Sequence, residues 1–382
     1  MQVMSCIHVF PYSHIIHNRK MERIKIGITQ GDINGIGYEL ILNTFEAEEM
    51  FSICTPVIYG SPKVATYHRK TLGSETSFQV VESAEMAKEG HLNMVNCFGE
   101  DELKIEFGQA TEEAGQAALT SLDKALMDLR DGKIAALVTN PLNNATIKRV
   151  DGKPFKGQTT YIEEMVGEGK KAIKLFIADR LRIALATDKM PVSEIPAHIT
   201  KDGLAERLVI LHNTLKRDFF IDNPRIAVLA LNPHADGKEE QEIIVPIIEE
   251  LFKRGVRCVG PYAADEFFGT GNHNHFDAVL AMYYDQGVSA FKSIAQNDGI
   301  NYTAGLPVLR TAPAIGVSYD LAGKNLIDDE QPFRQAIYTA VDVARNRVRF
   351  DKERVNPLQK QYVAKRDDSD KLKLDQVTEE DA

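Results

Sequence analysis

The sequence has no surplus of positive charge, few cysteines and no long apolar run. Its 382 residues include 45 Lys and Arg against 55 Asp and Glu, a formal net charge of -10. Since polyanions attract an excess of Lys and Arg, neither nucleic acid nor an anionic membrane is expected as a partner. No stretch approaches the roughly 20 apolar residues of a membrane-spanning helix.

The spacing of the cysteines argues against a fold held together by a metal or by disulfides. Cys6, Cys54, Cys97 and Cys258 show no paired spacing, which argues against a zinc knuckle and against a disulfide framework. This cysteine pattern is typical of reduced thiols, and we therefore expect a cytoplasmic chain. With no membrane-spanning stretch, the chain is also expected to be soluble.

Both ends of the chain differ in character from its middle. Residues 1–20 place apolar residues before Arg19 and Lys20, the reverse of the order in a secretory signal, and are predicted to be a disordered extension. Met21 opens a clean first strand and is a candidate for the biological start. Residues 351–382 mix charges of both signs with few apolar anchors, which predicts a mobile or surface-bound tail.

Between these ends, short runs rich in Val, Ile and Ala alternate with amphipathic stretches, a pattern typical of an α/β protein with largely parallel strands. The predicted strands are residues 24–29, 55–59, 134–138, 182–186, 225–230 and 278–282, and the predicted helices are 115–130, 205–218 and 239–254. The length suggests two domains. We expect residues 21–140 plus 305–350 to form one and residues 141–304 the other, with a ligand site in the cleft between them.

Closely spaced glycines follow the first strand in Thr29-Gln-Gly-Asp-Ile-Asn-Gly-Ile-Gly37, just before a helix that begins near Tyr38. Such glycines permit a tight turn and can bring amide groups toward an anion at a helix N-terminus. The spacing matches neither Gly-x-Gly-x-x-Gly nor a Walker loop, so an ordinary dinucleotide or nucleoside-triphosphate site is not indicated. Taken alone, the segment is best interpreted as a tight strand-to-helix turn.

Further motifs follow this turn in a fixed order. They are Val138-Thr-Asn-Pro-Leu142, Gly157-Gln-Thr159, Leu231-Asn-Pro-His-Ala235, the segment from Ala278 to Gly287, Phe291-Lys292, the segment from Gly299 to Thr311, and Tyr319-Asp-Leu-Ala-Gly323. Together with Asp32 and Glu39 they resemble the 4-hydroxythreonine-4-phosphate dehydrogenase (PdxA) family. Collinear matches over this length are far more specific than any single motif.

The resemblance implies a fold similar to isocitrate and isopropylmalate dehydrogenases, with two α/β/α domains around a central cleft. It implies a homodimer whose subunits share the active site. It also implies oxidation of 4-phosphooxy-L-threonine by NAD (or NADP), followed by decarboxylation, in pyridoxal 5'-phosphate biosynthesis.

The family's contacts to its phosphorylated substrate fall on residues that this chain keeps. They are Thr159, Lys292, Asn301 and Arg310, preceded by Gln158 where the family has a histidine. A guanidinium fork and an ammonium group suit a small dianion, because charge-assisted hydrogen bonds are about twice as strong as neutral ones. The alternative, that Lys292 and Arg310 are surface charges, is less favoured in this matched context.

The family's divalent metal (zinc, magnesium or cobalt) is implied to sit on three histidines, of which only His234 remains. Lys189 in Ala186-Thr-Asp-Lys-Met-Pro191 takes the second position and Tyr284 in Met282-Tyr-Tyr-Asp-Gln-Gly287 the third. A protonated ammonium offers no lone pair and a neutral phenol is a poor ligand. Normal metal binding is therefore expected to be weak or absent.

Lys189, Tyr284 and Asp285 are the candidate catalytic residues, with His234 nearby. One hypothesis is that Lys189 replaces the metal and polarises a substrate oxygen electrostatically. The alternative is simple loss of a ligand, with Asp188 and Asp285 supporting at most a weak metal site. Compared with the family, fewer side chains here can exchange a proton near neutral pH, because Gln158 and other amides replace histidines.

Three functions stay open on these grounds. The first is a working NAD-dependent dehydrogenase with altered or absent metal help. The second is a relative that binds a phosphorylated small molecule without turnover, and the third is a sister oxidoreductase for another phosphorylated hydroxy acid. NAD reduction with 4-phosphooxy-threonine, measured with zinc, magnesium and chelator, tests the first, which the absence of turnover under any condition would exclude.

Overall fold

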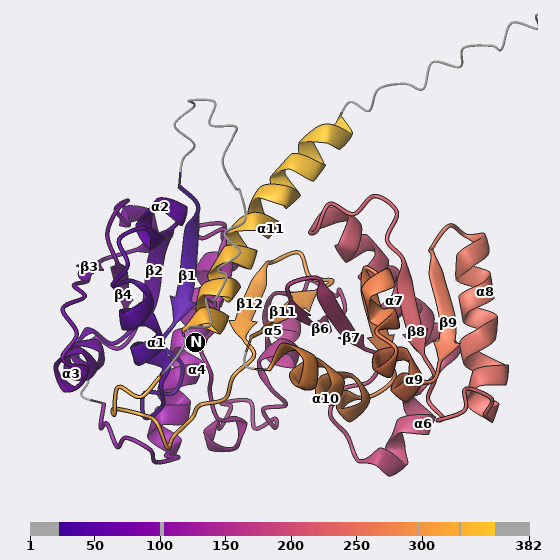
Figure 1. Ribbon diagram of the computed structural model, residues 1–382. Helices are drawn as coiled ribbons and strands as arrows, with labels where there is room; N and C mark the ends of the chain where they lie inside the picture. Colours follow the sequence, from indigo (N-terminus) through magenta and orange to yellow (C-terminus); the bar gives the residue numbers. More distant parts are fainter. Residues whose placement is uncertain (1–22, 100–102, 297, 328–329, 356–382) are drawn as a thin grey trace, which may run out of the picture.

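The computed structural model describes residues 23–99, 103–296, 298–327 and 330–355 (Figure 1). Its twelve strands form one sheet in the order β3-β4-β2-β1-β5-β12-β11-β6-β7-β10-β8-β9. Among the described residues, no helix is long and apolar enough to cross a membrane. The predicted extension at residues 1–20 and most of the predicted tail lie outside the described residues, while residues 351–355 form the end of a helix.

One half of the sheet is parallel and comes mainly from the first part of the chain. Its strands are β1 (Lys25–Thr29), β2 (Thr55–Gly60), β3 (Gln79–Val81), β4 (Asn93–Asn96) and β5 (Ala136–Val138). Its helices are α1 (Gly37–Thr44), α2 (Met50–Ile53), α3 (Pro62–Leu72) and α4 (Glu112–Arg130). The inner strands are apolar on both faces because helices cover both, as expected of a parallel sheet.

The other half is again parallel, with β7 (Leu181–Leu185), β8 (Ile226–Leu229), β9 (Cys258–Tyr262) and β10 (Ala278–Ala281). Its helices are α6 (Ile195–His198), α7 (Lys201–Arg217), α8 (Val245–Lys253), α9 (Ala264–Gly269) and α10 (Tyr284–Ala295). The α/β prediction is confirmed, and each strand and helix predicted from the sequence is present with its ends shifted by a few residues. A π-helical turn, Glu240–Ile244, forms the start of the third predicted helix.

Three strands that the sequence analysis did not name join the two halves. They are β6 (Ile173–Ala178), β11 (Ile300–Ala304) and β12 (Arg310–Pro313), and the pairings β12–β11, β11–β6 and β6–β7 are antiparallel. The sheet is therefore mixed at its centre. Opposed residues in neighbouring strands lie on the same face, and this register places polar side chains together on one face: Lys174, Asn301, Thr303 and Arg310.

The apolar core is arranged differently on the two faces of this sheet. On one face a single large cluster includes residues of α1, α7, α8 and α11 (Gln331–Val355). On the other face the core is divided into two clusters, one with α4 and α5 (Gln158–Val166) and one with α9 and α10. The polar residues of the central strands lie between these two clusters, so the fold leaves a gap in the apolar packing there.

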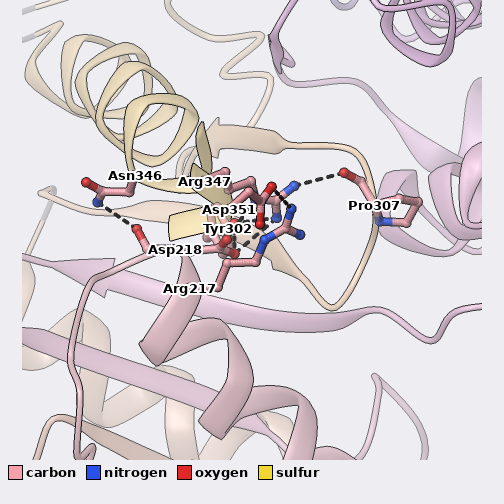
Figure 2. A network of polar contacts seen from close by, with 7 residues as sticks. All are labelled: Arg217, Asp218, Tyr302, Pro307, Asn346, Arg347 and Asp351. Carbon is pink, nitrogen blue, oxygen red and sulfur yellow. Dashed lines mark hydrogen bonds and ion pairs between the residues drawn. The ribbon is translucent and has the colours of Figure 1, made fainter. Parts of the chain in front are cut away.

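A buried polar network fixes α11 against the centre of the sheet (Figure 2). Arg347 of α11 donates from Nε to Asp218 Oδ1 at 2.7 Å and from Nη2 to Asp218 Oδ2 at 3.0 Å. Tyr302 of β11 donates to Asp218 Oδ2 at 2.5 Å. Asp218 is 2% exposed and Tyr302 fully buried. The network lies directly behind the polar face of β11, because Tyr302 stands between Asn301 and Thr303 and points the other way.

The glycine-rich turn is packed inside the protein. Every residue from Thr29 to Tyr38 is buried. Gly31 adopts a φ of +72°, and a Cβ there would lie 2.6 Å from the carbonyl oxygen of Pro141. The amide of Asp32 donates to that same carbonyl at 3.0 Å. The glycines therefore serve a tight turn with close backbone packing, as predicted for the segment taken alone.

His68 of α3 packs against this turn and forms a hydrogen bond with its backbone. Its Nε2 lies 2.8 Å from the carbonyl oxygen of Ile33 and must donate to it, and its ring contacts Phe107 at 4.8 Å between centroids. Burial lowers the pKa of His68 from 6.5 to about 4, because the imidazolium form would lose its hydration.

This shift predicts a specific loss of stability in mild acid. Between pH 6.5 and 4 the unfolded chain binds a proton at His68 that the folded chain does not, so the free energy of unfolding falls as pH falls. From pH 7 to pH 5 the contribution is roughly 2 kcal/mol. Urea unfolding at both pH values should show a pH-dependent loss that is smaller by this amount in His68→Gln. An equal loss in both proteins would contradict the assignment.

Candidate functional site

A cavity of about 960 Å³ lies over the polar face of the central strands, at the upper end of the range for small-molecule sites. Eight of the residues singled out in the sequence line it: Gln158, Thr159, Asp188, Lys189, Tyr284, Lys292, Asn301 and Arg310. They come from α5, α10, β11, β12 and the loop after β7. Residues more than 150 positions apart are thus brought to one surface.

The N-terminus of α5 forms one wall. Gly157 precedes the helix with a φ of +117°, and no side chain caps the first turn, which contains no acidic residue. Gln158, Thr159 and Thr160 of this turn line the cavity. Amide groups of a first helical turn have no partner within the helix, and the helix dipole adds partial positive charge. The wall is suited to an anion.

Arg310 of β12 lies beside this helix end and is only 3% exposed. Its Nε and Nη2 donate to Thr139 Oγ1 at 2.8 and 2.6 Å, and Nη2 also donates to Gln158 Oε1 at 2.7 Å. These partners are neutral, and none of the ion pairs among the described residues includes Arg310. Burial lowers the pKa of Arg310 to about 9. A guanidinium held without a counter-charge on a cavity wall favours an anionic ligand.

Lys292 of α10 adds a second cation. Tyr284, Val288 and Lys292 are spaced four residues apart, so one side of α10 faces the cavity. Lys292 Nζ donates to the carbonyl oxygen of Ala314 at 2.5 Å, and burial lowers the pKa of its ammonium. The ammonium has two further N–H groups to donate to a ligand.

Two acceptors on the cavity wall lack a protein donor. The Oδ1 atoms of Asn140 and Asn301 are buried and have no hydrogen-bond partner among the described residues. The amide nitrogen of Asn140 is already bound to the carbonyl oxygens of Thr29 and Gly37, which fixes the orientation of that side chain. Buried acceptors are normally satisfied, so both are available to donors of a ligand.

Lys189 and Tyr284 meet on another part of the cavity wall. Lys189 Nζ lies 4.4 Å from the centroid of the Tyr284 ring, a cation–π contact. Asp188, the one carboxylate among the described residues that line the cavity, faces Lys174 Nζ at 3.4 Å and Arg207 Nη2 at 3.9 Å. The lysines and arginines among these lining residues are Lys156, Lys174, Lys189, Lys292 and Arg310. The cavity is therefore strongly cationic.

Two predicted residues lie elsewhere. His234 and Asp285 are exposed, and neither lines the cavity. The loop of His234 is shaped by Glu240, whose Oε1 accepts from the amides of Leu231 and Asn232 at 2.7 and 2.9 Å. Within the described part of one chain, no group of three or more His, Cys, Asp or Glu side chains could hold a metal ion. The donor set does not fit the divalent metal that the resemblance implies.

Several residues of the site were not singled out in the sequence analysis. Among them, Thr139 and Asn140 follow β5, and Lys174 and Phe176 belong to β6. Thr139 and Asn140 lie within the quoted motif at the end of a predicted strand, where polar residues commonly reach a ligand. Lys174 and Phe176 carried no such signal, because β6 was not predicted.

The fold and the cavity define an α/β protein with a cationic small-molecule site. Residues 52–340 match the family model described as pyridoxal phosphate biosynthetic protein PdxA. The chain is 54% identical to the 4-hydroxythreonine-4-phosphate dehydrogenase of Bacteroides thetaiotaomicron over 94% of this chain and 99% of the relative. It is 36% identical to that of Prosthecochloris aestuarii over 84% and 97% of the two chains.

A solved structure of a 4-hydroxythreonine-4-phosphate dehydrogenase from Burkholderia phymatum matches with a TM-score of 0.70 and 28% identity, over 84% of this chain and 98% of that one. The chain belongs to the PdxA family.

Proposed function

We propose that this chain oxidises 4-phosphooxy-L-threonine with NAD and supports the decarboxylation that follows, as its named relatives indicate for pyridoxal 5'-phosphate biosynthesis. The observation that carries the proposal is Arg310, a buried guanidinium without a counter-charge at the uncapped end of α5. A phosphate dianion at this point would accept from the guanidinium, the first-turn amides of α5 and the Lys292 ammonium. Thr159 adds a hydroxyl donor.

The remaining part of the substrate is proposed to extend from the phosphate toward Asn301 and the wall formed by Lys189 and Tyr284. Asn301 Oδ1 has no donor among the described residues and would accept a hydrogen bond from a hydroxyl or ammonium group of the substrate. Once the phosphate is bound, the substrate is anchored at one end. Only a few further contacts are then needed to orient its reacting carbon.

The nicotinamide end of NAD (or NADP) is proposed to occupy the same cavity. Its wall includes two apolar residues after β5, Pro141 and Leu142, together with Pro313 at the end of β12 and Ile315 just beyond it. Asn140 Oδ1 beside them is an acceptor without a donor, as a carboxamide group requires. NAD, when bound, supplies the acceptor for a hydride.

In the proposed reaction, the carbinol C–H bond breaks with its electron pair leaving as hydride, and the hydroxyl proton leaves as the C=O bond forms. Asp285, in the first turn of α10, is the proposed acceptor of that proton by way of water. The bond to the carboxylate then breaks, CO₂ leaves, and its electron pair moves to the carbonyl oxygen. Protonation of the resulting enolate completes the step.

We also propose the domain division expected from the sequence, residues 21–140 plus 305–350 and residues 141–304. In support, β5 ends just before Asn140, and β12, which follows residue 305, pairs with β5. The cavity draws residues from both parts.

A homodimer with a shared site belongs to the same proposal. His234 is exposed and lies outside the cavity of its own chain, so it is accessible to a second copy. Sedimentation velocity is expected to show a dimer at micromolar concentration. A monomer with full activity would overturn this part of the proposal.

The test is NADH formation with 4-phosphooxy-L-threonine, repeated with NADP, with zinc or magnesium, and with chelator. We expect turnover with this substrate and no turnover with unphosphorylated 4-hydroxythreonine. Turnover only with another phosphorylated four-carbon hydroxy acid would support the sister-enzyme alternative. Calorimetric binding of substrate without turnover under all conditions would instead identify a binding protein.

A further inference from the structure

The residues at the implied metal site are cationic and aromatic where ligands would be needed. We infer that the ammonium of Lys189, held against the ring of Tyr284, acts as the electrophile at the substrate oxygen in place of a divalent metal. The inference deepens the proposed function and rests on it for the identity of the substrate.

The two side chains meet because of the order of the strands. Lys189 lies four residues after the end of β7, and Tyr284 is the first residue of α10, three residues after the end of β10. β7 and β10 are neighbouring parallel strands, so both segments leave the same edge of the sheet. This edge faces the cavity that Lys292 and Asn301 also line.

The loop that carries Lys189 is anchored by the two residues that precede it. Thr187 is buried, and its Oγ1 donates to the carbonyl oxygen of Met282 at 2.8 Å. The next residue, Asp188, faces Lys174 and Arg207. These contacts hold the backbone next to Lys189 while its side chain stays in the cavity.

The ammonium of Lys189 has no carboxylate partner among the described residues and is available to a ligand. Asp188 is occupied by two other cations, and none of the ion pairs among the described residues includes Lys189. Its contact on the protein side is the face of Tyr284 at 4.4 Å. The ring is itself held by Phe176, with the two centroids 6.4 Å apart. An aromatic face orients an ammonium without neutralising it.

An ammonium in this position suits both chemical steps. Negative charge develops on one oxygen, first as the O–H proton leaves and again when the electron pair of the carboxylate bond moves to the carbonyl oxygen. A cation fixed beside that oxygen stabilises this charge electrostatically. Lys189 acts in this mechanism through its charge and transfers no proton, so the mechanism needs no metal ligand.

The first test is kinetic. Lys189→Met is expected to lower kcat about 100-fold, the usual cost of removing one donor to a developing oxyanion, with KM changed less than about threefold. Lys189→Arg should recover part of the loss, and Lys253→Met, an exposed lysine at the end of α8, should match the wild type. Full activity in Lys189→Met would overturn the inference, as would wild-type turnover that chelator abolishes or a stoichiometric metal in the active protein.

The second test does not depend on turnover. Phosphoglycolohydroxamate combines a phosphate with an enolate-like oxygen, and inorganic phosphate lacks that oxygen. In calorimetry with chelator present, Lys189→Met should weaken the hydroxamate about tenfold or more and leave inorganic phosphate unchanged. Equal weakening of both, or of neither, would overturn the role of Lys189. Absence of wild-type turnover would overturn the proposed function alone.

Tyr284 is assigned a positioning role, which its variants can separate from simple packing. Tyr284→Phe keeps the ring face, so kcat should stay within about threefold of the wild type. Tyr284→Leu fills similar space without the ring and should lower kcat roughly tenfold at unchanged phosphate binding. A loss of the same size in Tyr284→Phe would show that the hydroxyl, not the ring, is what matters.

Discussion

Replacing Arg310 with Met is expected to lower kcat/KM about 100- to 1,000-fold without a comparable loss of stability. Each charge-assisted hydrogen bond to the phosphate contributes about 1.5–3 kcal/mol, and about 1.4 kcal/mol corresponds to a factor of ten. The same guanidinium is buried with only neutral partners, so its removal also relieves a desolvation cost. We expect the free energy of unfolding to change by less than about 1 kcal/mol, a small effect among point mutations.

Steady-state kinetics and urea unfolding measure the two effects separately. Inorganic phosphate should raise the Tm of the wild type and fail to do so in Arg310→Met, because a ligand stabilises only the state that binds it. Arg257→Met, which removes an exposed arginine outside the cavity, is the matched control. If Arg310→Met unfolded far more easily but bound phosphate normally, Arg310 would be a structural residue and the phosphate site would lie elsewhere.

Replacing Asp218 with Asn is expected to reduce the free energy of unfolding by about 3–5 kcal/mol, the cost of leaving a buried charge without its partner. The Arg347 side chain would keep its charge inside the protein, where Asp218 now accepts two of its hydrogen bonds (Figure 2). Tyr302 would lose its acceptor as well. Because Tyr302 lies between Asn301 and Thr303, weaker substrate binding should accompany the loss of stability.

The same network provides the control. Asp351 pairs with Arg217 at 3.0 Å, but their side chains are 60% and 38% exposed, and such surface pairs contribute at most about 1 kcal/mol. Asp351→Asn should therefore unfold almost as the wild type does. Replacing both buried partners, as Asp218→Leu with Arg347→Met, should recover much of the stability lost in Asp218→Asn. A loss below about 1 kcal/mol in Asp218→Asn would show that the buried pair is not a determinant of stability.

The sequence predicted the parts of this protein that depend on local pattern. Apolar runs such as 278–282 identified strands because a buried parallel strand is apolar on both faces. The strands β6, β11 and β12 escaped this reasoning, since each carries polar residues on the face that borders the cavity. Arg310 and Lys292 were nevertheless placed in the site, because the family's motifs surround them.

By itself the sequence determined the α/β class, the family and the residues available to hold a phosphate. Only the tertiary structure decided which of them meet. The order of β7 and β10 brings Lys189 to Tyr284, and the pairing of β11 with β12 places Asn301 and Arg310 on the same face of the sheet. The tertiary structure also leaves His234 and Asp285 outside the cavity and buries Asp218 together with Arg347. These outcomes depend on strand order and side-chain direction over long sequence separations, which no local pattern encodes.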